Sequence, residues 1–161
     1  MNTIVVGLGN PILSDDGVGV ITSYEVDREL SVEAREIVHV TEASMGGIRL
    51  MELLVGYDRA IIIDALTLDN NSIPGTIHKM SLEDLQEISP TQHSSSTHDT
   101  SLVTALKLGR HLGYKLPDEI IIYAVEVENV SDFSEVPTPA VAQAIPRLKS
   151  MVLEEIYKDL Q

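Results

Sequence analysis

The chain has 161 residues, of which 11 are basic and 25 acidic, so its formal net charge at pH 7 is −14. Nucleic-acid binding needs a positive footprint, and the sequence has no cluster of Lys and Arg, so we expect no nucleic-acid partner. There is no Cys, which excludes disulfides, thiolate metal ligands and a Cys nucleophile. No signal peptide is recognisable, and no apolar stretch approaches the roughly 20 residues that cross a bilayer. We therefore expect a single soluble, cytoplasmic domain over residues 1–161, without a membrane partner.

Five runs rich in β-branched residues predict strands over residues 3–8, 36–41, 59–64, 75–80 and 119–127. The first, third and fifth contain continuous apolar stretches, which are typical of strands buried on both faces of a parallel sheet. The second and fourth alternate more between apolar and polar residues. We expect these two strands nearer the edges of the sheet.

Helical patterns fall between the strands, over residues 17–30, 46–55 and 99–112. A short helix is predicted near Leu82, with Ser81 as its N-cap and Asp84 at the capping-box position. The last helix starts at Thr138-Pro139 and runs toward residue 160, and Pro146 should kink or split it. The alternation predicts an α/β fold of three layers: a twisted, mostly parallel five-stranded sheet with helices on both faces.

Candidate functional residues follow the predicted strands, because ligands of open α/β sheets bind beyond the carboxyl ends of the strands. Asp15 and Asp16 follow the first strand and precede a helix, whose N-terminus an acidic residue can cap. Only one of them is needed as a cap, and we take Asp15 as structural and Asp16 as a ligand, although their spacing fits either assignment. Asp64 ends an apolar strand, where a carboxylate serves either as a loop hydrogen-bond acceptor or as a metal ligand or general base.

His98 follows a polar loop and enters a predicted helix, as a surface residue or as a ligand, and His93 in the same loop competes with it. An imidazole and two carboxylates suit Ni, Zn, Fe or Mn and leave positions open for water or substrate. A dinucleotide site is not expected. The Gly7-Leu8-Gly9 segment begins such a fingerprint, but Ile12 stands where the third glycine belongs.

Several segments together resemble the hydrogenase maturation proteases. The N-terminal signature is carried by residues 7–10 (Gly-Leu-Gly-Asn) and 15–19 (Asp-Asp-Gly-Val-Gly). Residues 61–65, 74–76 and 96–99 agree in order and spacing. The resemblance covers nearly the full length of the chain.

This resemblance implies an endopeptidase that cleaves the C-terminal extension from a [NiFe]-hydrogenase large-subunit precursor after nickel insertion. Carried over by motif, Asp16, Asp64 and His98 bind the metal, with Asp16 and Asp64 also catalytic. The implied metal is nickel carried by the substrate, so that the site recognises a loaded precursor.

The sequence departs from the family after its second strand. Many members have Asp-Gly-Gly-Thr there, whereas residues 41–47 read Thr-Glu-Ala-Ser-Met-Gly-Gly. This loop borders the expected substrate cleft, to which we assign Asn10, Glu42 and Gly46. Two alternatives remain open: a non-catalytic, metal-dependent chaperone for the same precursor, and an esterase like peptidyl-tRNA hydrolase. The second lacks support, since no His precedes His39 and the surface is acidic.

Overall fold

The computed structural model describes residues 1–44, 47–68, 70–88, 97–158 and 160, without the side chains of residues 86, 88 and 97–101. Its centre is a five-stranded sheet in the order β2-β1-β3-β5-β4, in which only β4 is antiparallel to its neighbour. The strands are β1 (Thr3–Leu8), β2 (Val38–Ala43), β3 (Arg59–Leu66), β4 (Ile77–Ser81) and β5 (Glu119–Glu126).

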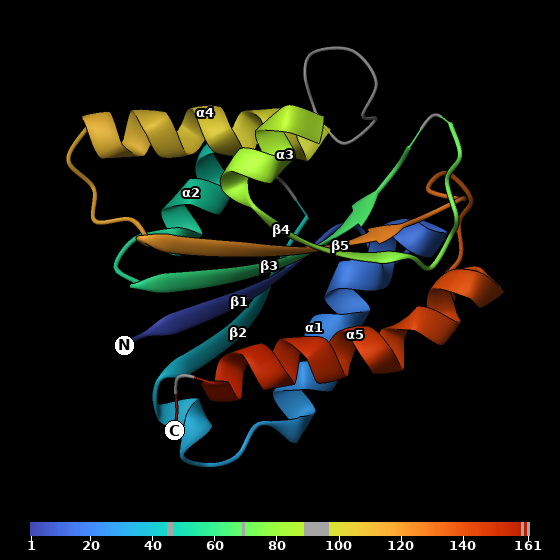
Figure 1. The fold of residues 1–161 in the computed structure, drawn as a ribbon, viewed down its shortest axis with the longest axis horizontal. Coiled ribbons are helices and arrows are strands. Elements are labelled where there is room, and N and C mark those ends of the chain that lie inside the picture. The colour runs from blue at the N-terminus through green and yellow to red at the C-terminus, as the bar shows by residue number, and fades with distance from the viewer. Residues whose placement is uncertain (45–46, 69, 89–96, 159, 161) are drawn as a thin grey trace.

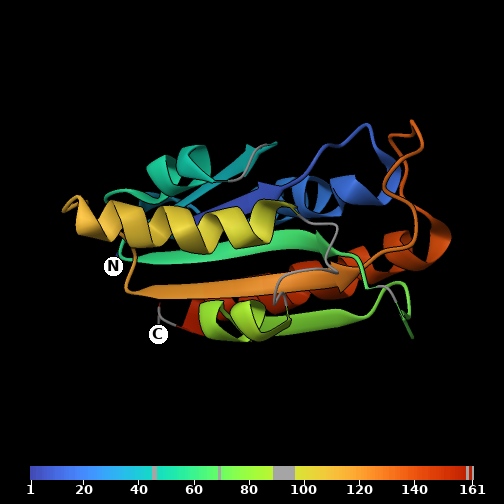
Figure 2. The same cartoon turned by 90° about the horizontal axis from the view of Figure 1, so that it is seen from above.

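Helices cover both faces of this sheet (Figures 1 and 2). One face carries α1 (Val18–Glu29) and α5 (Pro139–Lys158). The other carries α2 (Ile48–Leu54), α3 (Leu82–Ile88) and α4 (Thr97–His111). Two short 3-10 helices complete the described elements, η1 (Ser14–Gly17) and η2 (Ala34–Glu36). Among the described helices, none is long and apolar enough to cross a membrane.

Side-chain alternation along the central strands divides the core into two clusters. Ile62 and Leu66 of β3 pack with α2, α3 and α4, whereas Ile61 and Ile63 pack with α1 and α5. All residues of β1 and β3 are buried, while β2 and β4 form the two edges and are only partly buried. The predicted burial of the first, third and fifth strands and the three-layer fold are therefore confirmed.

Two predicted helix starts, those of α3 and α5, are also confirmed. The amide of Asp84 donates to Ser81 Oγ at 3.1 Å and the amide of Ser81 donates to Asp84 Oδ2 at 2.8 Å, which is the expected capping box. Pro139 is the first residue of α5. The split at Pro146 is not seen, because α5 continues through it as one helix. Other predicted boundaries shift by one or two residues, and the shift that affects the site is in β3. This strand runs on to Leu66, since it pairs with β5 over its whole length, so Asp64 lies inside the strand.

The connections from β1 define where a ligand can bind. The chain leaves β1 through α1 to β2 on one side, and returns through α2 to β3 on the other side. The strand order thus reverses between β1 and β3, and the crevice at the carboxyl ends of two such strands is the usual ligand site of a doubly wound sheet.

Candidate functional site

The loop after β1 is folded tightly against η1. Gly9 has φ +126°, and a Cβ at this position would lie 1.9 Å from the carbonyl oxygen of Asp16, so only glycine fits. The amide of Asn10 then donates to Asp16 Oδ2 at 2.8 Å. Among the residues that the structure describes, no further hydrogen bond to the Asp16 carboxylate is recorded, and the residue is partly exposed. Asp16 thus presents oxygen lone pairs next to the end of β1.

Asp15 has a different environment and is fully buried. Its Oδ2 accepts hydrogen bonds from the amides of Glu128 and Asn129, both at 3.1 Å. Its Oδ1 accepts from the amide of Thr138 at 2.7 Å and from the Thr138 hydroxyl at 3.0 Å. The carboxylate therefore joins η1 to the β5–α5 connection and to the start of α5, which gives Asp15 a structural role.

Asp64 lies on β3 with its side chain on the face covered by α2, α3 and α4, because it alternates with Ile62 and Leu66. The residue is 5% exposed, and its Oδ1 accepts the amide of Ala65 at 2.8 Å. Helix η1 contacts β3, so the segment that carries Asp16 lies against the strand that carries Asp64. The segments that carry the two carboxylates therefore meet at the β1/β3 crevice.

Helix α4 brings a third candidate to this edge. The helix ends at His111 and leads to the amino end of β5, so its first turn, which contains His98, lies toward the carboxyl ends of the strands (Figure 1). The His98 side chain is not among those described, and His93 and Gly46 lie outside the described residues. Among the described side chains, no three His, Asp or Glu residues form a group able to hold a metal ion. The assignment of His98 stays a prediction.

Close packing of helix α1 fixes the geometry of the crevice. A Cβ on Gly19 would lie 2.2 Å from the carbonyl oxygen of Ile63 and 2.6 Å from that of Leu8. A Cβ on Gly7 would lie 2.4 Å from the carbonyl oxygen of Gly19. The glycines of the N-terminal signature therefore let α1 approach the backbones of β1 and β3 at the positions that precede Asp64.

The two described residues assigned to the substrate cleft differ in their contacts. Asn10 lies in the β1 loop, where its Oδ1 accepts the amide of Ile12 at 3.2 Å. Glu42 is exposed on β2, and its Oε2 accepts the Tyr24 hydroxyl of α1 at 2.5 Å. This hydrogen bond raises the pKa of Tyr24. Glu42 therefore lies with α1, on the opposite face of the sheet from Asp64.

The structure adds a carboxylate and an imidazole that the sequence analysis did not select. Glu126 ends β5 and is 4% exposed, and its Oε2 lies 3.2 Å from His78 Nε2 on β4. Burial opposes its ionisation, but hydrogen bonds with Thr76, His78 and the Ile73 amide hold the pKa of Glu126 below its usual value. The signal was available, because a carboxylate at the end of an apolar strand is the pattern that singled out Asp64.

The backbone register places this pair near Asp64. His78 pairs with Ala124, which in turn pairs with Asp64, so the three residues form one row across β4, β5 and β3. Met80 and Ala124 pack in the cluster under α3 and α4, so His78 lies on the same sheet face as Asp64. Only the small Ala124 side chain separates them in this row.

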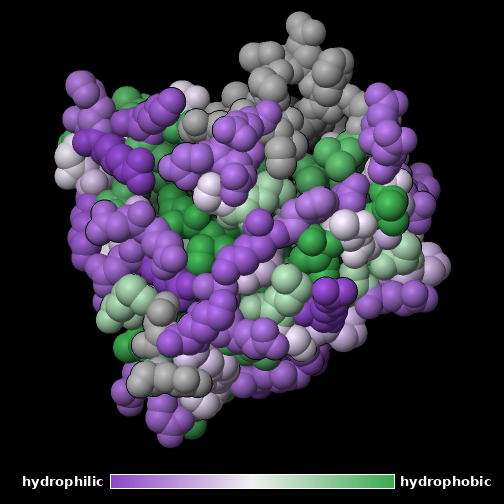
Figure 3. All heavy atoms as spheres, viewed as in Figure 1, coloured by the Kyte–Doolittle hydropathy of each residue, from purple (hydrophilic) through white to green (hydrophobic). Residues whose placement is uncertain are grey.

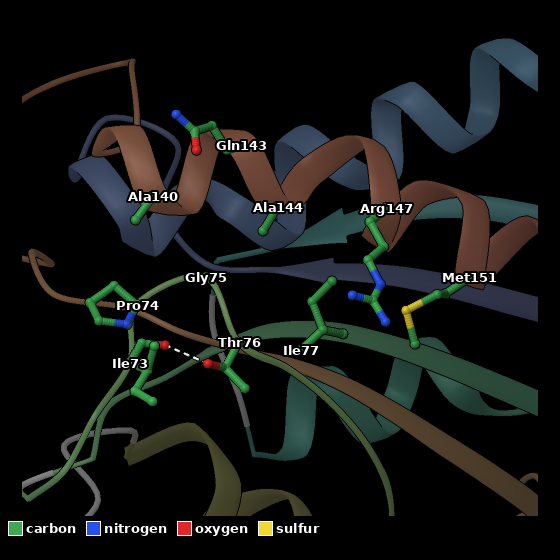
Figure 4. A pocket seen from close by; sticks show the side chains of 10 residues that line it. All are labelled: Ile73, Pro74, Gly75, Thr76, Ile77, Ala140, Gln143, Ala144, Arg147 and Met151. Atoms are coloured by element: carbon green, nitrogen blue, oxygen red, sulfur yellow. Dashed lines mark hydrogen bonds between the residues drawn. The ribbon is translucent and has the colours of Figure 1, made fainter.

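A separate pocket of about 610 Å³ lies on the other face, between α5 and the segment that leads into β4 (Figure 4). Arg147 and Met151 extend from α5 toward Ile77, and Thr76 Oγ1 donates to the carbonyl oxygen of Ile73 at 2.7 Å. None of the predicted site residues lines it. The outer surface viewed in Figure 3 is mostly hydrophilic, with apolar side chains in small patches, as the net charge of −14 leads one to expect.

Together these features define a class: an α/β protein of doubly wound type, with Asp16 and Asp64 on contacting segments at the reversal between β1 and β3. A family model described as hydrogenase maturation protease matches residues 24–155 of the chain. The match begins after Asp16 and includes Asp64 and His98. The chain belongs to the hydrogenase maturation protease family.

Full-length relatives extend the comparison over the N-terminal segment. The hydrogenase 2 maturation protease of Escherichia coli is 25% identical over 166 residues, covering 99% of this chain and 98% of its own. The hydrogenase maturating endopeptidase HybD from E. coli has the same fold, with a TM-score of 0.82, 23% identity and coverage of 99% and 94% of the two chains. HybD from Thermococcus kodakarensis has a TM-score of 0.72 and 21% identity, covering 97% and 99%. Membership of this family supports a peptidase that acts in hydrogenase maturation.

Proposed function

We propose that this protein removes the C-terminal extension of a [NiFe]-hydrogenase large-subunit precursor after nickel insertion, and that it recognises the nickel that the precursor carries. The observation that supports this most is that η1, which carries Asp16, contacts β3, which carries Asp64, at the topological reversal, on the side of the sheet toward which the helix that contains His98 begins (Figure 1). Family membership supplies the reaction class.

The chemistry of the donors fits a borderline metal ion. Asp16 carries one recorded hydrogen bond and is partly exposed, so its carboxylate has lone pairs available to a ligand that enters from outside. Carboxylate oxygen and imidazole nitrogen are ligands that Ni²⁺ accepts, and three protein ligands leave further positions for groups of the precursor. We therefore regard nickel as part of the substrate and not as a cofactor that the enzyme keeps.

Docking of the nickel would hold the scissile peptide bond beside the two carboxylates. A water oxygen then adds to the carbonyl carbon, the C–N bond breaks, and the leaving amine takes a proton. Two routes activate this step: nickel polarises the carbonyl, or a carboxylate of Asp16 or Asp64 accepts the proton of water as general base. Both need Asp16 and Asp64 in the crevice, and neither needs a covalent enzyme intermediate.

The test compares nickel-loaded and nickel-free precursor, with mass spectrometry to detect the released peptide. We expect cleavage of the loaded form only, and losses of about a hundredfold or more in Asp16→Asn, Asp64→Asn and His98→Ala. Asp118→Asn, an exposed carboxylate at the amino end of β5, is the matched control and should cleave normally. Equal cleavage of both precursor forms would contradict nickel recognition.

Two further results would change individual parts of the proposal. Normal cleavage by His98→Ala together with loss in His93→Ala would move the third ligand to His93. A precursor that binds in a nickel-dependent way but keeps its C-terminal peptide would favour the chaperone alternative. Family membership favours the protease over both this chaperone and a peptidyl-tRNA hydrolase-like esterase.

The remaining expectations about this site follow the same proposal. Asn10 would border the path of the extension, with Glu42 on the α1 side of the sheet and Gly46 in the loop after β2. Cytoplasmic action is expected because nickel insertion precedes the cut, and cell fractionation would test it.

A further inference from the structure

The chain contains no Trp and a single Phe, Phe133, which is 85% exposed. Val136, three residues later, is 69% exposed, and Ile12 in the β1 loop is 46% exposed. Scattered exposed apolar residues are common, but adjacent ones at a site are typical of an interaction surface. We call these three residues, Ile12, Phe133 and Val136, the apolar loop patch.

Backbone contacts place the three residues together. Leu13 and Ser134 form a parallel β-bridge, so their preceding residues Ile12 and Phe133 stand opposite each other across the bridge. The amide of Ser134 donates to the carbonyl of Ile12 at 3.0 Å, and the amide of Ser14 donates to the carbonyl of Ser134 at 2.9 Å. The Ser134 hydroxyl donates to the carbonyl of Val136 at 2.8 Å. Figure 2 shows the two loops side by side beyond the carboxyl ends of the strands.

The patch is also held in a fixed position relative to the candidate site. Asp15 accepts the amides of Glu128, Asn129 and Thr138, which fastens both ends of the loop that carries Phe133. The next residue of the chain is Asp16. An aromatic side chain on a loop ordered in this way loses little further conformational entropy on binding. This favours its use as an interface hot spot that contributes strongly to the binding free energy.

Charge around the patch selects the chemistry of the partner. The segments 2–27 and 116–146, which supply both loops, contain no Lys or Arg, and Glu128, Asp132 and Glu135 are exposed beside the patch. A partner that covers these residues needs an apolar surface opposite the patch and basic residues around that surface. Acidic residues there would repel Glu128, Asp132 and Glu135 and oppose association.

We propose that the apolar loop patch docks the folded body of the precursor whose extension is cleaved, through an apolar surface with basic residues around it. This rests on the proposed function. The site at Asp16 would recognise the nickel, while the patch next to it would contact the surrounding surface of the precursor and contribute to affinity. The patch would thereby contribute to the choice of hydrogenase without touching the reacting atoms.

The experiment measures steady-state cleavage of nickel-loaded precursor by Phe133→Ser and Val136→Ser, with binding of the same precursor measured by biolayer interferometry. Val32→Ser is the matched control, since Val32 is 76% exposed and lies between α1 and β2, toward the amino ends of the strands and away from the patch. We expect KM and the dissociation constant to rise about tenfold in Phe133→Ser, with kcat within about twofold of the wild type. Glu135→Lys should raise KM in the same direction, and more at low salt than at high salt.

The outcomes separate the two proposals. An unchanged KM in Phe133→Ser and Val136→Ser, with active wild-type enzyme, would overturn the docking role and leave the proposed function standing. Binding that depends on Phe133 without release of a peptide would support the patch and contradict the protease. A wild-type dimer that becomes monomeric in Phe133→Ser, with normal KM, would overturn the proposal in favour of a second copy of the chain as the occupant. Melting temperatures equal to that of the wild type in all variants would exclude unfolding as the cause of any change in KM or binding.

Discussion

Adjacent carboxylates, Asp15 and Asp16, should differ sharply in what their removal does. In Asp15→Ala, the partly buried amides of Glu128, Asn129 and Thr138 lose their acceptor. A buried donor left unsatisfied costs about 1–3 kcal/mol, and the lower end applies to partly buried amides, so we expect a loss of roughly 3 kcal/mol in the free energy of unfolding. In Asp16→Ala, only one amide, that of Asn10, loses a partner, and the expected cost is about 1 kcal/mol.

Urea unfolding at pH 7, followed by far-UV circular dichroism, measures both values under the same conditions. We expect a lower midpoint with an unchanged m-value for Asp15→Ala, and a midpoint close to the wild type for Asp16→Ala. Cleavage of nickel-loaded precursor should show the reverse order once enough folded Asp15→Ala protein is used. A loss of less than about 1 kcal/mol for Asp15→Ala, or a larger loss for Asp16→Ala, would refute the division into a structural and a functional carboxylate.

Three further predictions concern stability. Burial opposes ionisation of Glu155, but contacts with Lys79 and other partners lower its pKa from 4.5 to about 2. The ionised carboxylate should therefore contribute about 3 kcal/mol to the free energy of unfolding above pH 4.5. Acid titrations of unfolding should show this contribution disappear as the pH falls through 2. A flat stability profile over that range would contradict this. Gly75→Ala should destabilise by several kcal/mol in thermal melts, on the order of 3 kcal/mol, because φ is +89° and a Cβ would lie 2.6 Å from the carbonyl of Ala140. Gly19→Ala should lower both the melting temperature and the rate of cleavage, since it forces α1 away from Ile63; unchanged values for both would refute the packing argument.

The main features of the fold followed from residue patterns that act over short distances. Continuous apolar runs predicted the three central strands, because a strand buried on both faces has apolar residues at successive positions. Stronger alternation between apolar and polar residues predicted β2 and β4 as edges. The capping box at Ser81 and Asp84 is likewise local. The predicted end of β3 is two residues too early. The strand extends past Asp64 through its pairing with β5, and the residues of β3 alone do not indicate this pairing.

Features that depend on distant partners could not be predicted in this way. A structural role as a helix cap was predicted for Asp15, but its partner Thr138 lies 123 residues away, and no spacing rule connects the two. The buried ion pair of Arg59 with Glu155, at 2.6 Å, joins β3 to α5 over 96 residues. Glu126 is a different case, since its position at a strand end resembles that of Asp64 and its importance was visible but not recognised.

The N-terminal signature combines structural and functional requirements in one stretch of chain. Gly7 and Gly19 permit the backbone of α1 to contact β1 and β3, and Gly9 permits the turn that brings the amide of Asn10 to the Asp16 carboxylate. Without that approach, η1 could not lie against β3, and the two carboxylates would belong to separate surfaces. A chain that lost the glycines but kept Asp16 and Asp64 should therefore lose the site. The spacing of this motif is therefore set first by the close packing of the backbone. It matters for the chemistry because that packing brings Asp16 to the reversal of the strand order, where ligands of such sheets bind.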